Sequence, residues 1–332
     1  MAEMRSGGRR ERGGGAGTAL GGEVLTSRDN RWLKEFRVAL RGGVPTADGA
    51  VGVEGVRLVE EALTSGCRVV AVVFSESGER HRERLAPMIA RPEMGFPVLK
   101  TTDRLFEGIA DTEHPQGVAA LVVPRKWTLE EVFEVPEGKC AALIAVLAGV
   151  QDPGNVGTIL RTAAAFGATG AVTAATGQSG TASPFAPKAL RASAGAALHL
   201  PIVTGMGMGI LLTQLKLNGV RTLATCVGEE QGRVVEDRNW KMEDRKAQDE
   251  GLLKGEKEAR PLAPWEVDWR EPIALLLGNE GAGLPEEVVR AADARIHIQM
   301  ATKVESLNAA AAAAVLLYEA YRQRRKAVAG GE

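Results

Sequence analysis

Between residues 273 and 284 the chain reads Ile273-Ala274-Leu275-Leu276-Leu277-Gly278-Asn279-Glu280-Gly281-Ala282-Gly283-Leu284. An apolar run typical of a buried strand leads into a glycine-rich turn, and open α/β sheets bind their ligands at such strand ends. The spacing is not the G-x-G-x-x-G dinucleotide pattern, and it lacks the Gly-Lys-Ser/Thr ending of a phosphate loop. The Glu280 carboxylate could accept hydrogen bonds from a ribose hydroxyl, a cationic ligand or an arginine. The run therefore predicts either a cofactor loop or a tight turn with Glu280 in solvent.

A second polar cluster follows the apolar run 141–150, beginning at Asn155 and ending at Arg161. At 100° per residue, Ile159, Ala163 and Phe166 share one apolar stripe of a predicted helix over 152–166. Arg161 lies about 200° from Ile159 around the same helix. We therefore expect Arg161 to point away from the core, toward substrate, a second subunit or solvent.

The third cluster is Glu305-Ser306-Leu307-Asn308, which precedes six consecutive alanines over 309–314. Alanine favours helix and has almost no side-chain bulk, so we predict a helix over 307–325 with another segment packed closely against it. Ser306 is the predicted N-cap, and the start of the helix would offer N–H groups to an anionic ligand. Capping does not explain Asn308, where an alanine would be less costly.

Apolar periodicity divides the chain into two α/β domains. Residues 1–22 are rich in glycine and arginine and predict a flexible basic tail. Residues 23–125 predict a small α/β domain, 126–140 a linker and 141–332 a second α/β domain. In the second domain strand-like runs alternate with helices, one of them over 187–197, so its sheet should be mostly parallel. A charge-rich stretch without a strand pattern, 228–271, is predicted to be a solvated insertion.

The composition limits the classes of function. The net charge of -1 comes from 41 Lys+Arg and 42 Asp+Glu, so any nucleic-acid site must be a local patch. The three cysteines Cys67, Cys140 and Cys226 have no paired spacing, as expected of thiols in a reducing cytosol. The four histidines show no metal-ligand spacing. With neither a spanning apolar run nor a signal-peptide core, we expect a soluble cytoplasmic protein without metal.

In their order along the chain, the three clusters resemble the three motifs of the SpoU/TrmH family of RNA ribose 2′-O-methyltransferases, within the SPOUT superfamily. Four further segments are similar to the family: 183–195, His199-Leu200-Pro201-Ile202, Glu54-Gly55 and His114-Pro115-Gln116-Gly117-Val118. The resemblance covers about residues 25–325, apart from the insertion. It implies a C-terminal domain with a mostly parallel sheet and a deep trefoil knot. The first domain would be L30e-like and would bind the RNA substrate.

The resemblance also implies a cofactor, S-adenosylmethionine, and roles for ten residues. The cofactor-binding residues would be Gly278, Ile298 and Leu307, with Met300 and Thr225 beside them. Methyl transfer would involve Arg161, Asn155, Glu280, Ser306 and Asn308. Gln299 departs from the family, which usually has proline there, and this leaves the cofactor loop less rigid.

The reaction requires a ribose 2′-hydroxyl to lose its proton while aligned with the methyl–sulfonium bond. Because arginine is a poor base at its usual pKa above about 12, two roles for Arg161 stay open. It either acts as a base with a strongly depressed pKa, or holds a phosphate beside the hydroxyl and stabilises the alkoxide. Ser306 and Asn308 would orient the hydroxyl, and Glu280 would hold Asn155 or Arg161. The outward direction of Arg161 favours a site shared across a homodimer.

The predicted substrate is ribosomal RNA, most of all 23S rRNA, because the first domain resembles that of the rRNA-modifying branch. Transfer RNA is the alternative substrate. A non-catalytic RNA-binding protein of the same fold is a second alternative, and the presence of Arg161, Glu280 and Asn308 argues against it. A nucleotide-dependent oxidoreductase would need a dinucleotide loop that the chain lacks.

Overall fold

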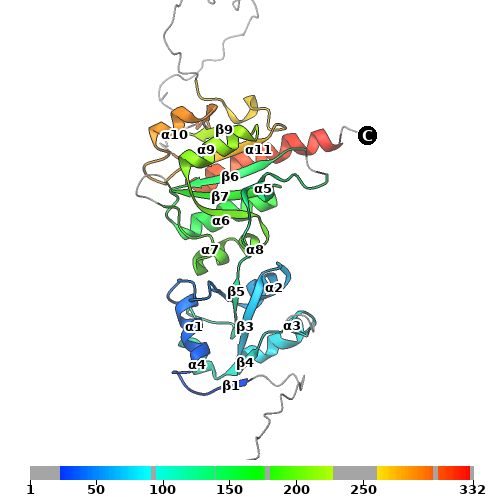
Figure 1. The fold of residues 1–332 in the computed structure, drawn as a ribbon, viewed down its shortest axis with the longest axis vertical. Helices are drawn as coiled ribbons and strands as arrows, with labels where there is room; N and C mark the ends of the chain where they lie inside the picture. The colour runs from blue at the N-terminus through cyan, green and yellow to red at the C-terminus, as the bar shows by residue number, and fades with distance from the viewer. Residues whose placement is uncertain are drawn as a thin grey trace, which may run out of the picture.

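The computed structural model describes residues 23–90, 95–138, 140–175, 180–226, 260–301 and 306–329. The predicted tail 1–22 lies outside these residues, as do Glu305 and positions 228–259 of the predicted insertion. Within the described residues the chain forms two sheets, one from strands β1–β5 and one from strands β6–β11. Figure 1 shows them in two separate bodies, with α7, α8 and α2 at the boundary.

The first sheet has the strand order β1-β4-β3-β5-β2. Strand β5 pairs antiparallel with β3 and β2, whereas β4 pairs parallel with β1 and β3. Helices α2 and α3 contribute buried side chains to one core cluster, and α1 and α4 contribute to another. The elements are β1 (Glu23–Leu25), α1 (Arg31–Leu40), β2 (Val51–Glu54), α2 (Val56–Thr64), β3 (Arg68–Ser75), α3 (Arg82–Ile89), β4 (Val98–Thr101), α4 (Asp103–Glu107) and β5 (Val118–Val123).

The second sheet has the order β11-β9-β10-β6-β7-β8, and its strand pairs in the described residues are all parallel, as predicted. The knot implied by the family resemblance stays a prediction. The elements are β6 (Leu143–Ala148), α6 (Pro153–Ala165), β7 (Gly170–Ala175), α7 (Pro187–Ala192), α8 (Ala196–His199), β8 (Ile202–Gly207), α9 (Met208–Leu217), β9 (Arg221–Thr225), β10 (Ile273–Leu277), α10 (Glu286–Ala291), β11 (Ala294–Ile296) and α11 (Ala309–Ala329).

The strand order explains where a site can form. From β6 the chain builds outward through β7 and β8, then returns to the other side of β6 to form β9, β10 and β11. Strands β6 and β10 are buried along their whole length and pair side by side. Loops that leave the carboxyl ends of neighbouring parallel strands at such a reversal enclose a crevice. The segments 149–155 and 278–284 are therefore brought together.

The predicted single helix over 187–197 is wrong, because the structure has two short helices, α7 and α8. The chain turns at Ala194 and Gly195, where φ is 50° and 86°. These left-handed values end a right-handed helix, and they suit glycine better than alanine. Figure 1 places the pair of helices at the boundary with the first sheet.

The predicted insertion 228–271 extends too far. Among its described residues, Leu262 forms a parallel bridge to Ile296, and Trp269 is fully buried. The guanidinium of Arg324 on α11 donates hydrogen bonds to the carbonyl oxygens of Trp269 at 2.6 Å and Glu271 at 2.8 Å, and also to Ala141 and Ala142. Residues 260–271 thus belong to the folded domain, which their charged composition concealed.

The predicted linker 126–140 contains a short helix, α5 (Leu129–Phe133). A capping box between Thr128 and Glu131 starts it, which satisfies N–H groups that have no partner within the helix. Val132 is fully buried against the second sheet. This segment therefore contributes to the core of the second domain.

Candidate cofactor and methyl-transfer site

A cavity of about 300 Å³ lies at the carboxyl edge of the second sheet. It lies between the loop after β10 and the segment that leads into α11. All five predicted cofactor-binding residues line this cavity, together with Glu280 and Ser306. They are Gly278, Ile298, Leu307, Met300 and Thr225. The hydroxyl of Thr225 donates to the Leu276 carbonyl at 2.9 Å, so it is already used within the sheet.

The loop after β10 has a fixed shape. The backbone N–H of Asn279 donates to Gly283 O and that of Gly283 donates to Asn279 O, each at 3.0 Å. A Cβ on Gly278 would lie 2.4 Å from the carbonyl carbon of Gly283, far inside van der Waals contact. Glycine is therefore required at Gly278 because the two arms of the loop approach so closely.

The side chain of Asn279 holds this loop to the sheet. Its Oδ1 accepts the backbone N–H groups of Gly281 and Ala282, both at 2.9 Å. Its Nδ2 donates to Gly149 O at the end of β6, also at 2.9 Å. The sequence predicted no role for Asn279. The sequence does contain a signal for this role, because an asparagine two residues before a glycine is the pattern of an Asx turn.

Glu280 accepts hydrogen bonds from the second cluster, at Asn155, and from the residues just before it. Its carboxylate accepts the Asn155 Nδ2 donor at 2.9 Å and the backbone N–H groups of Gln151 at 3.2 Å and Asp152 at 3.3 Å. Partial burial acts to raise the pKa of Glu280, but these hydrogen bonds outweigh it and hold the pKa below its ordinary value. Of the two partners predicted for Glu280, the described structure contains the contact with Asn155.

Asn308 joins the third cluster to the second. Its Nδ2 donates to Asn155 Oδ1 at 3.1 Å, and its Oδ1 accepts the N–H of Ala310 at 2.9 Å. Asn308 therefore caps α11, and the predicted capping role of Ser306 is wrong because the helix begins only at Ala309. Ser306 is exposed at the cavity instead.

Arg161 is exposed on α6, as its helical position predicted, and it does not line the cavity. Six residues separate it from Asn155, which corresponds to a rise of about 9 Å along the helix. Within the part of the chain that the structure describes, its guanidinium forms no ion pair. A single chain thus brings Asn155, Glu280 and Asn308 together and leaves Arg161 apart from them.

Two further polar groups hold the chain where β6 ends and α6 begins. Thr181 Oγ1 accepts the N–H of Gly149 at 2.9 Å and lies 2.7 Å from Leu147 O, which fixes the end of β6. Asp152, the N-cap of α6, pairs with Lys188 at 2.5 Å. The hydrogen bond from Lys188 is the largest cause that lowers the pKa of Asp152. Nothing in the sequence marked Thr181, because its partners are backbone atoms.

No group of three or more His, Cys, Asp or Glu side chains in the described residues could hold a metal ion. No described helix is long and apolar enough to cross a membrane.

The parallel sheet and its edge cavity define a cofactor-dependent α/β enzyme. Residues 142–318 match the SpoU rRNA Methylase family, and the chain belongs to this family. Residues 46–120 match the MRM3-like substrate binding domain. The protein is therefore an RNA 2′-O-ribose methyltransferase that uses S-adenosylmethionine.

Named relatives cover most of the chain. The 23S rRNA (guanosine-2′-O-)-methyltransferase RlmB of Xanthomonas campestris is 32% identical over 81% of this chain and 95% of its own length. The 23S rRNA (guanosine(2553)-2′-O)-methyltransferase RlmP of Bacillus subtilis is 29% identical over 89% and 97%. The AdoMet-bound rRNA methyltransferase of Sinorhizobium meliloti has a similar structure, with a TM-score of 0.70, 26% identity and coverage of 90% and 97%.

Proposed function

We propose that this protein methylates a ribose 2′-hydroxyl of 23S rRNA. The observation that carries the proposal is the hydrogen-bonded series Glu280, Asn155, Asn308, which connects all three sequence clusters beside one cavity. The RlmB and RlmP relatives are named as 23S rRNA methyltransferases, and the match of residues 46–120 to a substrate binding domain supports a contact with the substrate outside the cavity.

The cavity residues fit S-adenosylmethionine. Gly278 would let the ligand approach the loop backbone, while Ile298 and Leu307 supply apolar walls and Met300 and Thr225 border them. The close contact of Gly278 with Gly283 keeps the loop after β10 in one conformation before the cofactor binds. The loop therefore loses less conformational entropy on binding. When bound, S-adenosylmethionine supplies an electrophilic methyl group on a sulfonium.

The protein must then orient a ribose hydroxyl and stabilise the alkoxide that forms as the hydroxyl proton passes to solvent. The Ser306 hydroxyl lies at the cavity, and the Asn308 side chain is fixed by its bonds to Ala310 and Asn155. We assign these two groups to orienting the hydroxyl, and Asn155 and Glu280 to holding Asn308. For Arg161 we favour contact with the phosphate beside the reacting ribose, because an exposed guanidinium suits bidentate phosphate binding.

We further propose a homodimer in which Arg161 acts at the partner's cavity. Helix α11, which packs on α6, exposes Val315, Tyr318 and Tyr321, and the ring of Phe166 at the end of α6 lies 5.5 Å from that of Tyr318. This apolar face is unusual for a monomer and suits a second copy. A copy seated there would bring its own α6, and with it a second Arg161, near this cavity.

Mixed dimers test this arrangement. Arg161→Ala and Asn155→Ala chains, each inactive alone, are co-expressed with different tags. If Arg161 acts across the interface, each heterodimer has one complete site, so an equal mixture should recover about a quarter of wild-type activity. If Arg161 acts within its own chain, no heterodimer has a complete site and activity stays absent.

The substrate is tested with purified protein, labelled S-adenosylmethionine, and either 23S rRNA or tRNA. We expect methyl transfer to 23S rRNA and recovery of the label as a 2′-O-methyl nucleoside. Preference for tRNA would support the alternative substrate. Calorimetry should detect binding of S-adenosylmethionine and none of NAD, whereas binding of NAD alone would contradict the proposed chemistry. We also propose a cytoplasmic location, where rRNA is modified.

A further inference from the structure

Several family-like segments take no part in the cavity. Glu54-Gly55 and the 114–117 run lie in the first domain, and the end of the 183–195 segment lies in α7 and the turn after it. None of these residues lines the methyl-transfer cavity. Strand β2, which ends at Glu54, contacts α7 across the boundary between the domains, and Figure 1 shows this boundary between α2 and the α7–α8 pair.

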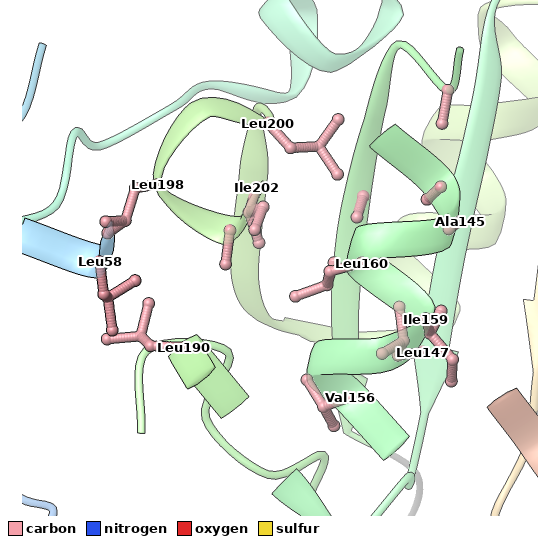
Figure 2. Packing of buried hydrophobic residues seen from close by; sticks show 14 of the residues in the cluster. Leu58, Ala145, Leu147, Val156, Ile159, Leu160, Leu190, Leu198, Leu200 and Ile202 are labelled. Atoms are coloured by element: carbon pink, nitrogen blue, oxygen red, sulfur yellow. The ribbon is translucent and has the colours of Figure 1, made fainter. Parts of the chain in front are cut away.

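The boundary has an apolar centre. Leu58 of α2 packs with Leu190 of α7 and Leu198 of α8 in one buried cluster, and Figure 2 shows the three side chains close together. Leu190 and Leu198 are only 0% and 2% exposed, although both lie on short helices at the surface of their own domain. Leu58 of α2 supplies part of this burial, so separating the two domains would expose apolar side chains to water.

The backbones also approach closely. A Cβ on Gly195 would lie 2.7 Å from the Glu61 Cβ of α2, and Gly195 has a φ of 86°. Only glycine fits both the space and the conformation. The Cys67 thiol lies 3.9 Å from the Leu198 carbonyl oxygen, which extends the contact to the start of β3.

Polar groups fix the edge of the boundary. The buried Glu54 carboxylate accepts the N–H of Asp111 at 2.8 Å and the hydroxyl of Thr112, which holds this loop in place. The loop presents Asp111 to Arg191 of α7, and their side chains form an ion pair at 2.7 Å. A second pair, His199 with Glu61 at 2.8 Å, lies at the α8 end.

We infer that these segments dock the substrate-binding domain in one fixed position, with Glu54, Asp111 and Arg191 as positioning residues. Docking fixes the distance between the RNA contacts of this domain and the methyl-transfer cavity. This distance selects which ribose of the bound RNA is methylated. This selection rests on the proposed function, whereas the docking itself does not. A domain held only by its linker would sample many positions and give no such selection.

The first experiment measures docking without RNA. Hydrogen exchange should be slow in α2 of the wild-type protein and faster in Leu198→Asp, while peptides from the cavity stay protected. A six-residue Gly-Ser insertion between Pro124 and Arg125, in the connection from β5 to α5, should leave both α2 protection and the radius of gyration unchanged. Unchanged α2 exchange in Leu198→Asp, or expansion of the insertion variant, would overturn the docking.

The second experiment measures positioning. Arg191→Asp places two acids together and should lower kcat/KM for rRNA about five- to tenfold, with the Kd for S-adenosylmethionine unchanged. Adding Asp111→Arg to the same chain should restore kcat/KM to within about twofold. The matched control is Arg290→Asp, which breaks an exposed pair with Glu286 far from the boundary and should have no effect.

Failure of the charge swap to rescue activity would overturn the positioning role. If the wild-type protein methylates no rRNA, the proposed function fails, and the exchange measurements still decide whether the domains dock.

Discussion

Replacement of Gly278 by alanine tests the cofactor loop most sharply. The added Cβ would lie 2.4 Å from Gly283 C and 2.5 Å from Leu284 N, and both are backbone atoms that cannot rotate away. The loop arms must separate, which strains or breaks the two 3.0 Å hydrogen bonds between Asn279 and Gly283. Overpacking of this kind costs about 1–3 kcal/mol, which corresponds to a roughly 5- to 150-fold weaker binding of S-adenosylmethionine.

The same loop supplies a matched control. A Cβ on Gly281 would meet only Asn279 Oδ1 at 3.7 Å, an ordinary contact, so Gly281→Ala should bind S-adenosylmethionine nearly as well as wild type. Calorimetric titration of both variants, with circular dichroism to check folding, makes the comparison. Wild-type affinity in Gly278→Ala, or equal losses in the two variants, would refute the reasoning.

Three further predictions concern the site and its support. Arg161→Ala should abolish methyl transfer and leave the Kd for S-adenosylmethionine nearly intact; simultaneous loss of both would contradict its assigned role. Arg324→Met should lower the free energy of unfolding by about 3 kcal/mol, because buried carbonyls lose their donor, and an unchanged urea midpoint would exclude this role. The folded pKa of Glu280 is below its ordinary 4.5, so its stabilising effect is complete above that pH and is lost as the pH falls through the folded pKa. Urea unfolding should therefore separate Glu280→Gln from wild type above about pH 5 and less so below pH 4, whereas a constant difference would contradict it.

Much of the parallel domain could be predicted because its central strands β6 and β10 are apolar and buried on both faces. The run Ile273–Leu277 was predicted with the bounds that the structure has, since a fully buried strand contrasts strongly with its flanking turns. The five cofactor-binding candidates were likewise brought to one cavity. Strands β1 and β2 were missed, because a strand of three or four residues carries too little periodicity.

Other features were hidden because they depend on contacts between distant residues. Trp269 lies among charged residues, and its burial, the Arg324 hydrogen bonds and the bridge at Leu262 show that this segment is folded. The role of Asn279 depends on a carbonyl at Gly149, which lies 130 residues earlier in the chain. The N-cap of α11 is Asn308, two residues after the predicted N-cap Ser306. Local helix propensity does not locate a helix start to within two residues.

The central claim is that this chain methylates rRNA through the site that its three clusters form. The most direct measurement maps 2′-O-methylated nucleotides across ribosomal RNA from cells with the protein, without it, and with only Arg161→Ala. We predict that at least one 23S rRNA ribose loses its methyl group without the protein and is not restored by the Arg161→Ala variant. Identical maps in all three, or full restoration by the variant, would contradict the account.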